Sequence, residues 1–243
     1  MASAQQPPIE RTLQRQITPQ RLAPYLAETG TLSGAIQLYR WNTELSGAVY
    51  EALHVFEVFL RNAIDEQLCR WNAIQPDPDQ GRLHSPDWLL DPAVLLSRIA
   101  GRDIPEARRR ASRSTSRRPH GHRDPRHEDI LAAMPLGTWR FLLPGRSDAG
   151  KQRIWDEALH EAFPHLTRTP VQLERAVDGV YRLRNRVAHL EPVINSNVPA
   201  QLTNMRTVIG ALDPRLLSWF SSTERISTTL RNRPTRPCPP TPG

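Results

Sequence analysis

The apolar positions of the chain repeat with a helical period along its longest proline-free stretch, residues 25–75. Eleven of them recur there at i, i+3, i+4 and i+7: Leu45, Ala48, Val49, Ala52, Leu53, Phe56, Phe59, Leu60, Ala63, Ile64 and Leu68. This spacing predicts a long amphipathic helix with one broad apolar face. Shorter patterns of the same period predict further helices near residues 88–99, 128–133, 136–143, 147–163, 170–190 and 200–220. No stretch alternates apolar and polar residues for more than a few positions, so the sequence predicts an all-α fold.

The distribution of core residues predicts a single helical domain at residues 19–220 with a flexible N-terminus, residues 1–18. Within the domain, residues 101–127 hold nine arginines and only one large aliphatic residue, Ile104. Such a segment buries too little apolar surface to offset the entropy lost on ordering, so we expect a disordered basic insertion there. Residues 221–243 are also poor in core residues, and we expect a disordered tail.

The charge of the chain suggests a polyanionic partner such as nucleic acid, because 32 lysines and arginines face 25 acids, a net charge of +7. In residues 101–127 nine arginines face three acids, so this segment alone carries +6. Six of its arginines are candidates for non-specific contacts with RNA phosphates: Arg108, Arg109, Arg110, Arg113, Arg117 and Arg118. The alternative is a solvated loop without a binding role.

Several classes of protein are excluded. The two cysteines, Cys69 and Cys238, form neither a disulfide framework nor a CxxC zinc motif. No apolar run approaches the roughly 18 residues of a membrane span, and the first residues are too polar for a signal peptide, so we expect a cytoplasmic protein without membrane contact. His120, His122 and His127 lie among arginines that repel metal ions, so we expect neither a metal nor another cofactor.

Polar side chains crowd the last two turns of the helix expected at residues 170–190: Arg182, Arg184, Asn185, Arg186 and His189. Arg184 follows Val180 at i+4 in the apolar register, so its guanidinium needs a partner or a groove. A histidine transfers protons near neutral pH, and a guanidinium stabilises phosphoryl charge, which are the requirements of RNA cleavage without a metal. On spacing alone, the alternative is a basic final turn with a helix-capping histidine.

Three segments in this order resemble one family. Residues 184–189, Arg-Asn-Arg-Val-Ala-His, resemble the R-x4-6-H motif of the HEPN superfamily in its R-N-x-x-x-H form. Residues 38–65 resemble the opening of the Abi-like (abortive infection) proteins, whose long first helix carries E-x-x-L-R-N, here Glu57 to Asn62. Residues 136–143 resemble the central G-x-W segment of that group. The resemblance covers about residues 30–215 and leaves out the Arg-rich insertion and the tail.

The resemblance implies a HEPN-type helical bundle with metal-independent endoribonuclease activity, acting as a toxin or anti-phage effector that cleaves RNA by attack of a 2′-hydroxyl. It also implies a homodimer and an antitoxin, either protein or RNA, as a further partner. Arg184 and His189 would be the catalytic pair, with Asn185 as the polar residue that follows the arginine. Arg182 fits the motif at its longer spacing, and we prefer Arg184 because asparagine follows it.

The resemblance further implies supporting roles for Glu57 and Arg61, which would reach the active groove and hold Arg184 or His189, with Asn62 assisting. On pattern alone, the stripe of His54, Glu57 and Arg61 is equally well a solvated helix face.

One position departs from the family pattern. HEPN toxins that are paired with nucleotidyltransferase antitoxins often carry a tyrosine two residues after the histidine, where this chain has Glu191. We therefore do not expect control by modification of that tyrosine. Arg182 and Arg186 remain supporting cations at the end of the helix.

Two alternatives to the nuclease remain. In one, a HEPN fold binds RNA or a partner protein while its motif is catalytically idle. In the other, the basic insertion is the functional part, and its deletion would abolish RNA affinity.

Overall fold

A computed structural model describes residues 8–116, 123–145 and 148–234 of the chain. These residues form α-helices and one 3-10 helix, and the only β-type pairing among them is an isolated bridge between Pro76 and Leu83. The predicted all-α class is therefore confirmed. None of the helices in the described ranges has both the length and the apolar content needed to cross a membrane. The chain divides into two compact units, which are described in turn.

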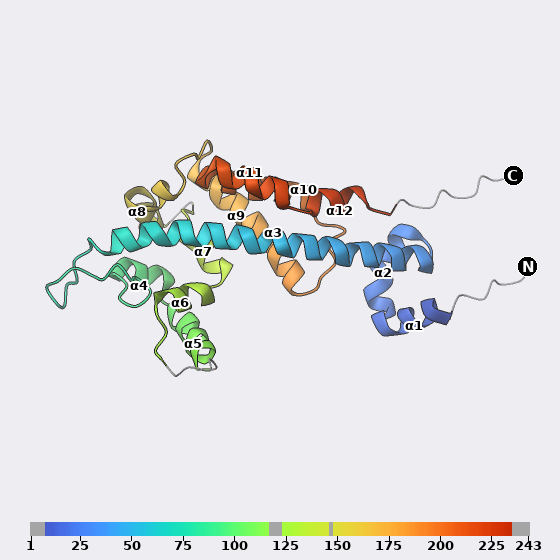
Figure 1. The fold of residues 1–243 in the computed structure, drawn as a ribbon, viewed down its shortest axis with the longest axis horizontal. Helices are drawn as coiled ribbons and strands as arrows, with labels where there is room; N and C mark the ends of the chain where they lie inside the picture. Colours follow the sequence, from blue (N-terminus) through green and yellow to red (C-terminus); the bar gives the residue numbers. More distant parts are fainter. Residues whose placement is uncertain (1–7, 117–122, 146–147, 235–243) are drawn as a thin grey trace, which may run out of the picture. The chain divides into compact units, whose positions relative to one another are not determined.

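The long predicted helix is α3 (Leu32–Asn72), drawn in blue to cyan in Figure 1. Its apolar stripe is buried as predicted, and Phe56, Leu60 and Ile64 have no exposed surface. The helix starts later than the proline-free stretch because Gly30 has a φ of 72° and ends the preceding helix in the left-handed conformation. Residues 32–52 of α3 belong to the first unit, and residues 53–72 belong to the second.

Within the described ranges, the first unit comprises residues 8–52, 186–196 and 224–234. Its helices are α1 (Pro8–Ile17), α2 (Pro19–Thr29), the first part of α3, and α12 (Ile226–Arg231). The indole nitrogen of Trp41 on α3 donates a hydrogen bond of 2.8 Å to the carbonyl of Thr229 on α12. The amide oxygen of Asn42, one residue further along α3, accepts a hydrogen bond of 2.8 Å from the backbone nitrogen of Val193. These contacts fix the late segments of the unit against α3.

Both termini contain helices where the sequence predicted flexibility. Residues 8–17 form α1, and the backbone nitrogen of Thr18, the N-cap of α2, donates a hydrogen bond to the carbonyl of Gln14 on α1. Residues 226–231 form α12. Ile226 is fully buried and anchors α12. A single buried aliphatic side chain in a helix of six residues leaves little compositional signal, which explains why the sequence did not predict α12. Residues 1–7 and 235–243 lie outside the described ranges.

The second unit comprises residues 53–185 and 197–223. After α3 it contains α4 (Val94–Ala100), α5 (Asp103–Thr115), α6 (His127–Ala133), α7 (Leu136–Leu142), α8 (Ala149–Glu157) and the 3-10 helix η1 (Leu159–Ala162). Helix α9 (Pro170–Ala188) belongs to this unit as far as residue 185. The unit ends with α10 (Val198–Leu212) and α11 (Pro214–Thr223). In its core the rings of Trp88 and Trp139, both fully buried, meet edge to face at 6.3 Å. Trp139 lies on α7, whereas Trp88 lies in a turn before α4, so the helix predicted from residue 88 begins only at Val94.

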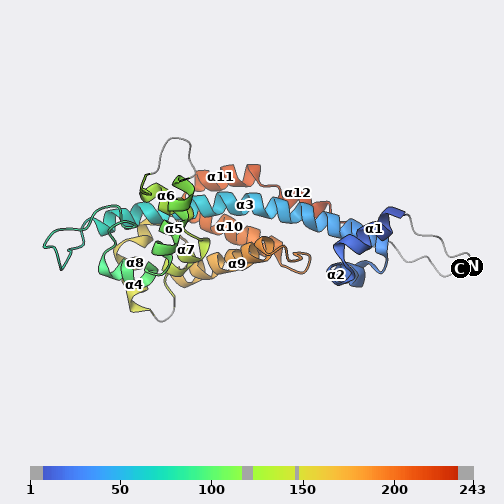
Figure 2. The same ribbon diagram turned by 90° about the horizontal axis from the view of Figure 1, so that it is seen from below.

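Helix α5 corrects the prediction of a disordered insertion. Residues 103–115 form a helix that packs against α6, and Figures 1 and 2 both show the two helices (green) side by side. Its buried side consists of Ile104, Ala107, Ala111 and Thr115. Alanine lets two helices approach closely and loses no side-chain entropy on burial, so this face is apolar without large aliphatic residues. The arginines occupy the opposite, exposed side.

Candidate functional site

Helix α9 carries the predicted motif at its C-terminal end. The helix ends at Ala188, and Leu190 follows with a φ of 57°, a left-handed conformation that is unfavourable for a residue with a side chain. The backbone nitrogen of Glu191 donates a hydrogen bond of 2.8 Å to the carbonyl of Arg186, which closes the helix end. The motif crosses the boundary between the units, because Arg184 belongs to the second unit and His189 to the first.

In the second unit, Arg184 lies on the wall of a cavity of about 320 Å³. The other walls come from α7, the start of α5, and Tyr181, one helical turn before Asn185 on α9. A Cβ atom added to Gly137 on α7 would lie 3.4 Å from the Tyr181 ring, an ordinary van der Waals contact, so this position of the G-x-W segment packs against α9. The hydroxyl of Thr138 donates a hydrogen bond to the carboxylate of Asp103 at this cavity.

A second guanidinium lines the same cavity. The Nε atom of Arg140 lies 3.0 Å from a carboxylate oxygen of Asp178, and its guanidinium lies over the Tyr181 ring at 5.3 Å. The other oxygen of Asp178 pairs with Arg182 at 2.5 Å. The side chain of Arg182 is 78% exposed, whereas that of Arg140 is 30% exposed. The two candidate motif arginines thus differ in position: Arg184 lines the cavity, whereas Arg182 forms an ion pair on the surface.

Glu57 on α3 lies close to Arg184. The side chain is half-buried, and burial raises the pKa of its carboxyl above the usual range, while the nearby charges of Arg184, Arg61 and His54 act in the opposite direction. The charge of Arg184 thus acts on Glu57, but neither Glu57 nor Arg61 is among the residues that line the Arg184 cavity, and their hold on Arg184 remains a prediction. Their catalytic roles remain a prediction.

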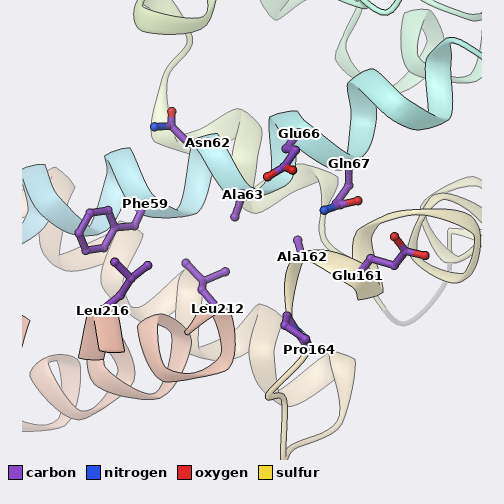
Figure 3. A pocket seen from close by; sticks show the side chains of 10 residues that line it. All are labelled: Phe59, Asn62, Ala63, Glu66, Gln67, Glu161, Ala162, Pro164, Leu212 and Leu216. Carbon is purple, nitrogen blue, oxygen red and sulfur yellow. The ribbon is translucent and has the colours of Figure 1, made fainter. Parts of the chain in front are cut away.

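Asn62 and Asn185 lie beside arginines of their own helices. The amide oxygen of Asn62 accepts a hydrogen bond of 3.3 Å from Nε of Arg61, and that of Asn185 accepts one of 3.4 Å from Arg184. Asn62 also lines a cavity formed by α3, η1 and the α10–α11 segment, which Figure 3 shows with Phe59 and Leu216 on one side. Arg184 does not line this cavity.

In the first unit, His189 is exposed directly after α9. Arg186 is engaged in the turn that follows, because it donates a hydrogen bond of 3.1 Å to the carbonyl of Pro192 and lies 3.6 Å from Glu191. The neighbours of His189, Ala188 and Leu190, line a cavity of about 480 Å³ against α3. His189 thus lies at the edge of a hollow surface in its own unit.

The candidate RNA-binding arginines of α5 are exposed: Arg108, Arg109, Arg110 and Arg113. Glu106 pairs with both Arg109 and Arg110, and Arg110 also donates to the carbonyl of Ala133. Arg117 and Arg118 lie outside the described residues, as do His120 and His122.

A polar cluster that the sequence did not predict joins α3 and α6. The Nε2 atom of His127 lies 2.9 Å from Oδ1 of Asp65 and 3.8 Å from Sγ of Cys69. Burial alone would lower the pKa of His127, but its contacts with Asp65 and Cys69 outweigh burial and raise the pKa to about 10. Asp65 and Cys69 are i, i+4 neighbours on a predicted helix. The third member comes from a segment predicted to be disordered, so no local signal could have found the cluster.

Comparisons of this chain with protein-family models, with curated proteins and with solved structures find no match.

Proposed function

We propose that the protein is a metal-independent endoribonuclease with a HEPN-type helical bundle, and that Arg184 and His189 form its catalytic pair. One observation supports this most directly. Arg184, the arginine that best fits the motif, lines an open cavity together with a second guanidinium, Arg140, and has the carboxylate of Glu57 nearby. Two guanidiniums at one cavity are suited to a phosphodiester, since each offers a fork of N–H donors to phosphate oxygens.

In the proposed reaction His189 accepts the proton of a ribose 2′-hydroxyl, and the 2′-oxygen attacks the adjacent phosphorus. Arg184 stabilises the charge that develops on the non-bridging oxygens. The bond between phosphorus and the 5′-oxygen then breaks, and the 5′-oxygen takes up a proton. The products are a 2′,3′-cyclic phosphate and a 5′-hydroxyl. The spacing of Arg184 and His189 in the sequence supports their joint action.

The surrounding residues have positioning roles in this proposal. Glu57 orients Arg184 through its charge, and the charge of Arg61 acts on the same carboxylate. Asn185 supports the guanidinium of Arg184 through its amide oxygen. Arg140 is held by Asp178, which leaves its guanidinium at the cavity wall.

The biological setting follows from the same resemblance. We propose a toxin or anti-phage effector that acts as a homodimer and is restrained by an antitoxin, either protein or RNA. The exposed arginines of α5 would add non-specific contacts to RNA phosphates and steer the substrate toward the protein.

The test is cleavage of total cellular RNA by purified protein, wild type beside His189→Ala. His165→Ala is a matched control, because His165 is also exposed and lies outside the motif. We expect wild type and the control to cut RNA at equal rates and His189→Ala to be inactive. Equal cleavage by His189→Ala would contradict the proposal.

An RNA-binding protein with an idle motif is the second candidate, and the exposed arginines of α5 favour it. Growth of cells after induction distinguishes the two. The nuclease predicts that wild type stops growth and that the Arg184→Ala/His189→Ala double variant does not. Equal growth of both strains, with RNA binding retained, would favour the idle module.

A further inference from the structure

Three potential metal ligands of different chemistry converge between α3 and the start of α6. The carboxylate of Asp65, the thiol of Cys69 and the imidazole of His127 each place one ligand atom within 4.8 Å of the other two. The imidazole is buried, with 8% of the His127 side chain exposed, and the carboxylate of Asp65 is 13% exposed. None of these residues has a role in the proposed nuclease.

The distances between these atoms match the edges of a tetrahedral zinc site. Zinc binds nitrogen and oxygen at about 2.0–2.2 Å and sulfur at about 2.3 Å, so tetrahedral angles place a nitrogen about 3.5 Å from a sulfur and about 3.3 Å from an oxygen. The corresponding distances from Nε2 of His127 are 3.8 Å to sulfur and 2.9 Å to oxygen. Both distances from Nε2 lie within a few tenths of an ångström of these values, and the oxygen and the sulfur lie within 4.8 Å of each other.

The outer contacts of the cluster are those of a metal site. The indole nitrogen of Trp88 donates a hydrogen bond of 2.8 Å to Oδ1 of Asp65, which fixes the carboxylate. The second ring nitrogen of His127, Nδ1, is buried without a hydrogen-bond partner in the described chain and lies 3.9 Å from a carboxylate oxygen of Asp87. Metal-bound histidines commonly direct their other nitrogen to such a carboxylate.

The geometry does not fit a nucleophilic cysteine. A catalytic Cys–His–Asp chain places the thiol on one ring nitrogen and the carboxylate on the other. Here Nε2 of His127 contacts both Asp65 and Cys69, and the carboxylate of Asp87 lies 3.9 Å from Nδ1, beyond hydrogen-bond distance. Three ligand atoms of one ion must lie close to one another, as Nε2 of His127, the carboxylate oxygen of Asp65 and Sγ of Cys69 do here.

A second cluster of potential ligands, Asp77, His84 and Asp91, provides an internal comparison. Arg82 occupies it, because its guanidinium lies 2.9 Å from Asp91 and 3.7 Å from Asp77. A fixed positive charge there opposes binding of a cation. At the first cluster, Asp65 pairs with His127, which is itself a potential ligand, and the described chain contains no ion pair between Asp65 and an arginine or lysine.

We propose that Asp65, Cys69 and His127 bind one thiophilic divalent cation of the zinc type. Thiolate and imidazole ligands favour zinc over magnesium or calcium, which prefer oxygen ligands. With three protein ligands, the fourth position of a tetrahedral ion is left to water. The ion joins the start of α6 to α3. The proposal goes beyond the proposed function and is independent of it.

The test is titration of metal-free, full-length protein with Co²⁺, followed by displacement with Zn²⁺. Tetrahedral Co²⁺ gives intense visible bands, and a Co²⁺–thiolate bond adds a charge-transfer band in the near ultraviolet. We expect both signatures with one equivalent of Co²⁺ and their loss when Zn²⁺ is added. Absence of the bands at stoichiometric Co²⁺ would overturn the proposal.

Variants identify the ligands. Cys69→Ser should remove the charge-transfer band, and His127→Gln should weaken Co²⁺ binding more than about tenfold, while the matched control His84→Gln should bind like wild type. Unchanged binding by His127→Gln, or loss of binding in His84→Gln alone, would contradict the assignment. Circular dichroism verifies the fold of each variant. In addition, Zn²⁺ should raise the melting temperature of wild type and leave that of Cys69→Ser unchanged.

Cleavage assays separate this proposal from the nuclease. Folded Cys69→Ser should lose the cobalt signature and still cut RNA. RNA cleavage by a wild type that gives no cobalt bands would refute the metal site alone. Cobalt bands in a wild type that does not cut RNA would refute the nuclease alone.

Discussion

The carboxylate of Asp178 holds two arginines of very different exposure, and this allows a quantitative prediction. One oxygen lies 3.0 Å from Nε of Arg140, whose side chain is 30% exposed. The other lies 2.5 Å from Arg182, whose side chain is 78% exposed. Asp178 itself is 17% exposed. If distance decided the strength of these pairs, the pair with Arg182 would be the stronger one.

We expect exposure to decide instead. Coulomb's law gives about 5 kcal/mol for unit charges about 3 Å apart at an effective dielectric constant of about 20, and desolvation and side-chain entropy offset most of this. A contacting ion pair that is shielded from water is screened less, and such pairs couple by up to about 3 kcal/mol. Exposed ion pairs retain about 0.2–1 kcal/mol. The coupling of Asp178 to Arg140 should therefore exceed its coupling to Arg182 by about 1 kcal/mol.

Double-mutant cycles measure both couplings. The free energy of unfolding in urea is determined for Asp178→Ala, Arg140→Ala, Arg182→Ala and the two double variants that contain Asp178→Ala. The pair with Arg182 is the matched control, because it shares the same carboxylate. Equal couplings, or a larger coupling to Arg182, would refute the reasoning.

Three further predictions concern catalysis, RNA binding and acid stability. Arg184→Ala should lower the single-turnover rate of RNA cleavage by about 100- to 1,000-fold, and Arg182→Ala should lower it by less than about threefold. Similar losses of rate in both variants would refute the choice of Arg184. Arg108→Ala should reduce the slope of log affinity against log salt for single-stranded RNA by about 0.7, measured by fluorescence anisotropy, and an unchanged slope would remove this arginine from the RNA contact. The backbone N–H of Ser85 donates a hydrogen bond that holds the pKa of Asp91 well below its usual value. Asp91 therefore stabilises the folded state above about pH 4 and loses this effect on acidification. The difference in melting temperature between wild type and Asp91→Asn should be larger at pH 7 than at pH 3, and a constant difference would contradict this prediction.

The sequence predicted the helices that bury large aliphatic and aromatic side chains. The stripe of α3 is one example, and the apolar face of α9, with Leu173 and Val177 fully buried, is another. Helix α5 escaped prediction because its buried side is built largely from Ala107 and Ala111, which hydrophobicity patterns count weakly. Helix α12 escaped because one residue, Ile226, supplies its buried anchor.

The sequence likewise indicated some features of the candidate site and not others. The position of Arg184 in an apolar register indicated that its guanidinium would need a groove, and the residue lines a cavity. The prediction that Glu57 holds Arg184 rests on the family resemblance, since nothing local links α3 to α9. The role of Asp178 in holding Arg140, and the cluster around His127, depend on contacts between distant segments. Periodicity and spacing do not encode such contacts.

The chemistry of the RNA ends tests the central proposal most directly. Purified wild-type protein is incubated with a single-stranded RNA of defined sequence in EDTA, at a temperature at which circular dichroism shows the metal-free protein to be folded, and the product ends are identified by mass spectrometry. The proposal predicts 2′,3′-cyclic phosphate and 5′-hydroxyl ends from wild type and no cleavage by His189→Ala. Products with 5′-phosphate ends, or cleavage by His189→Ala at the wild-type rate, would contradict it.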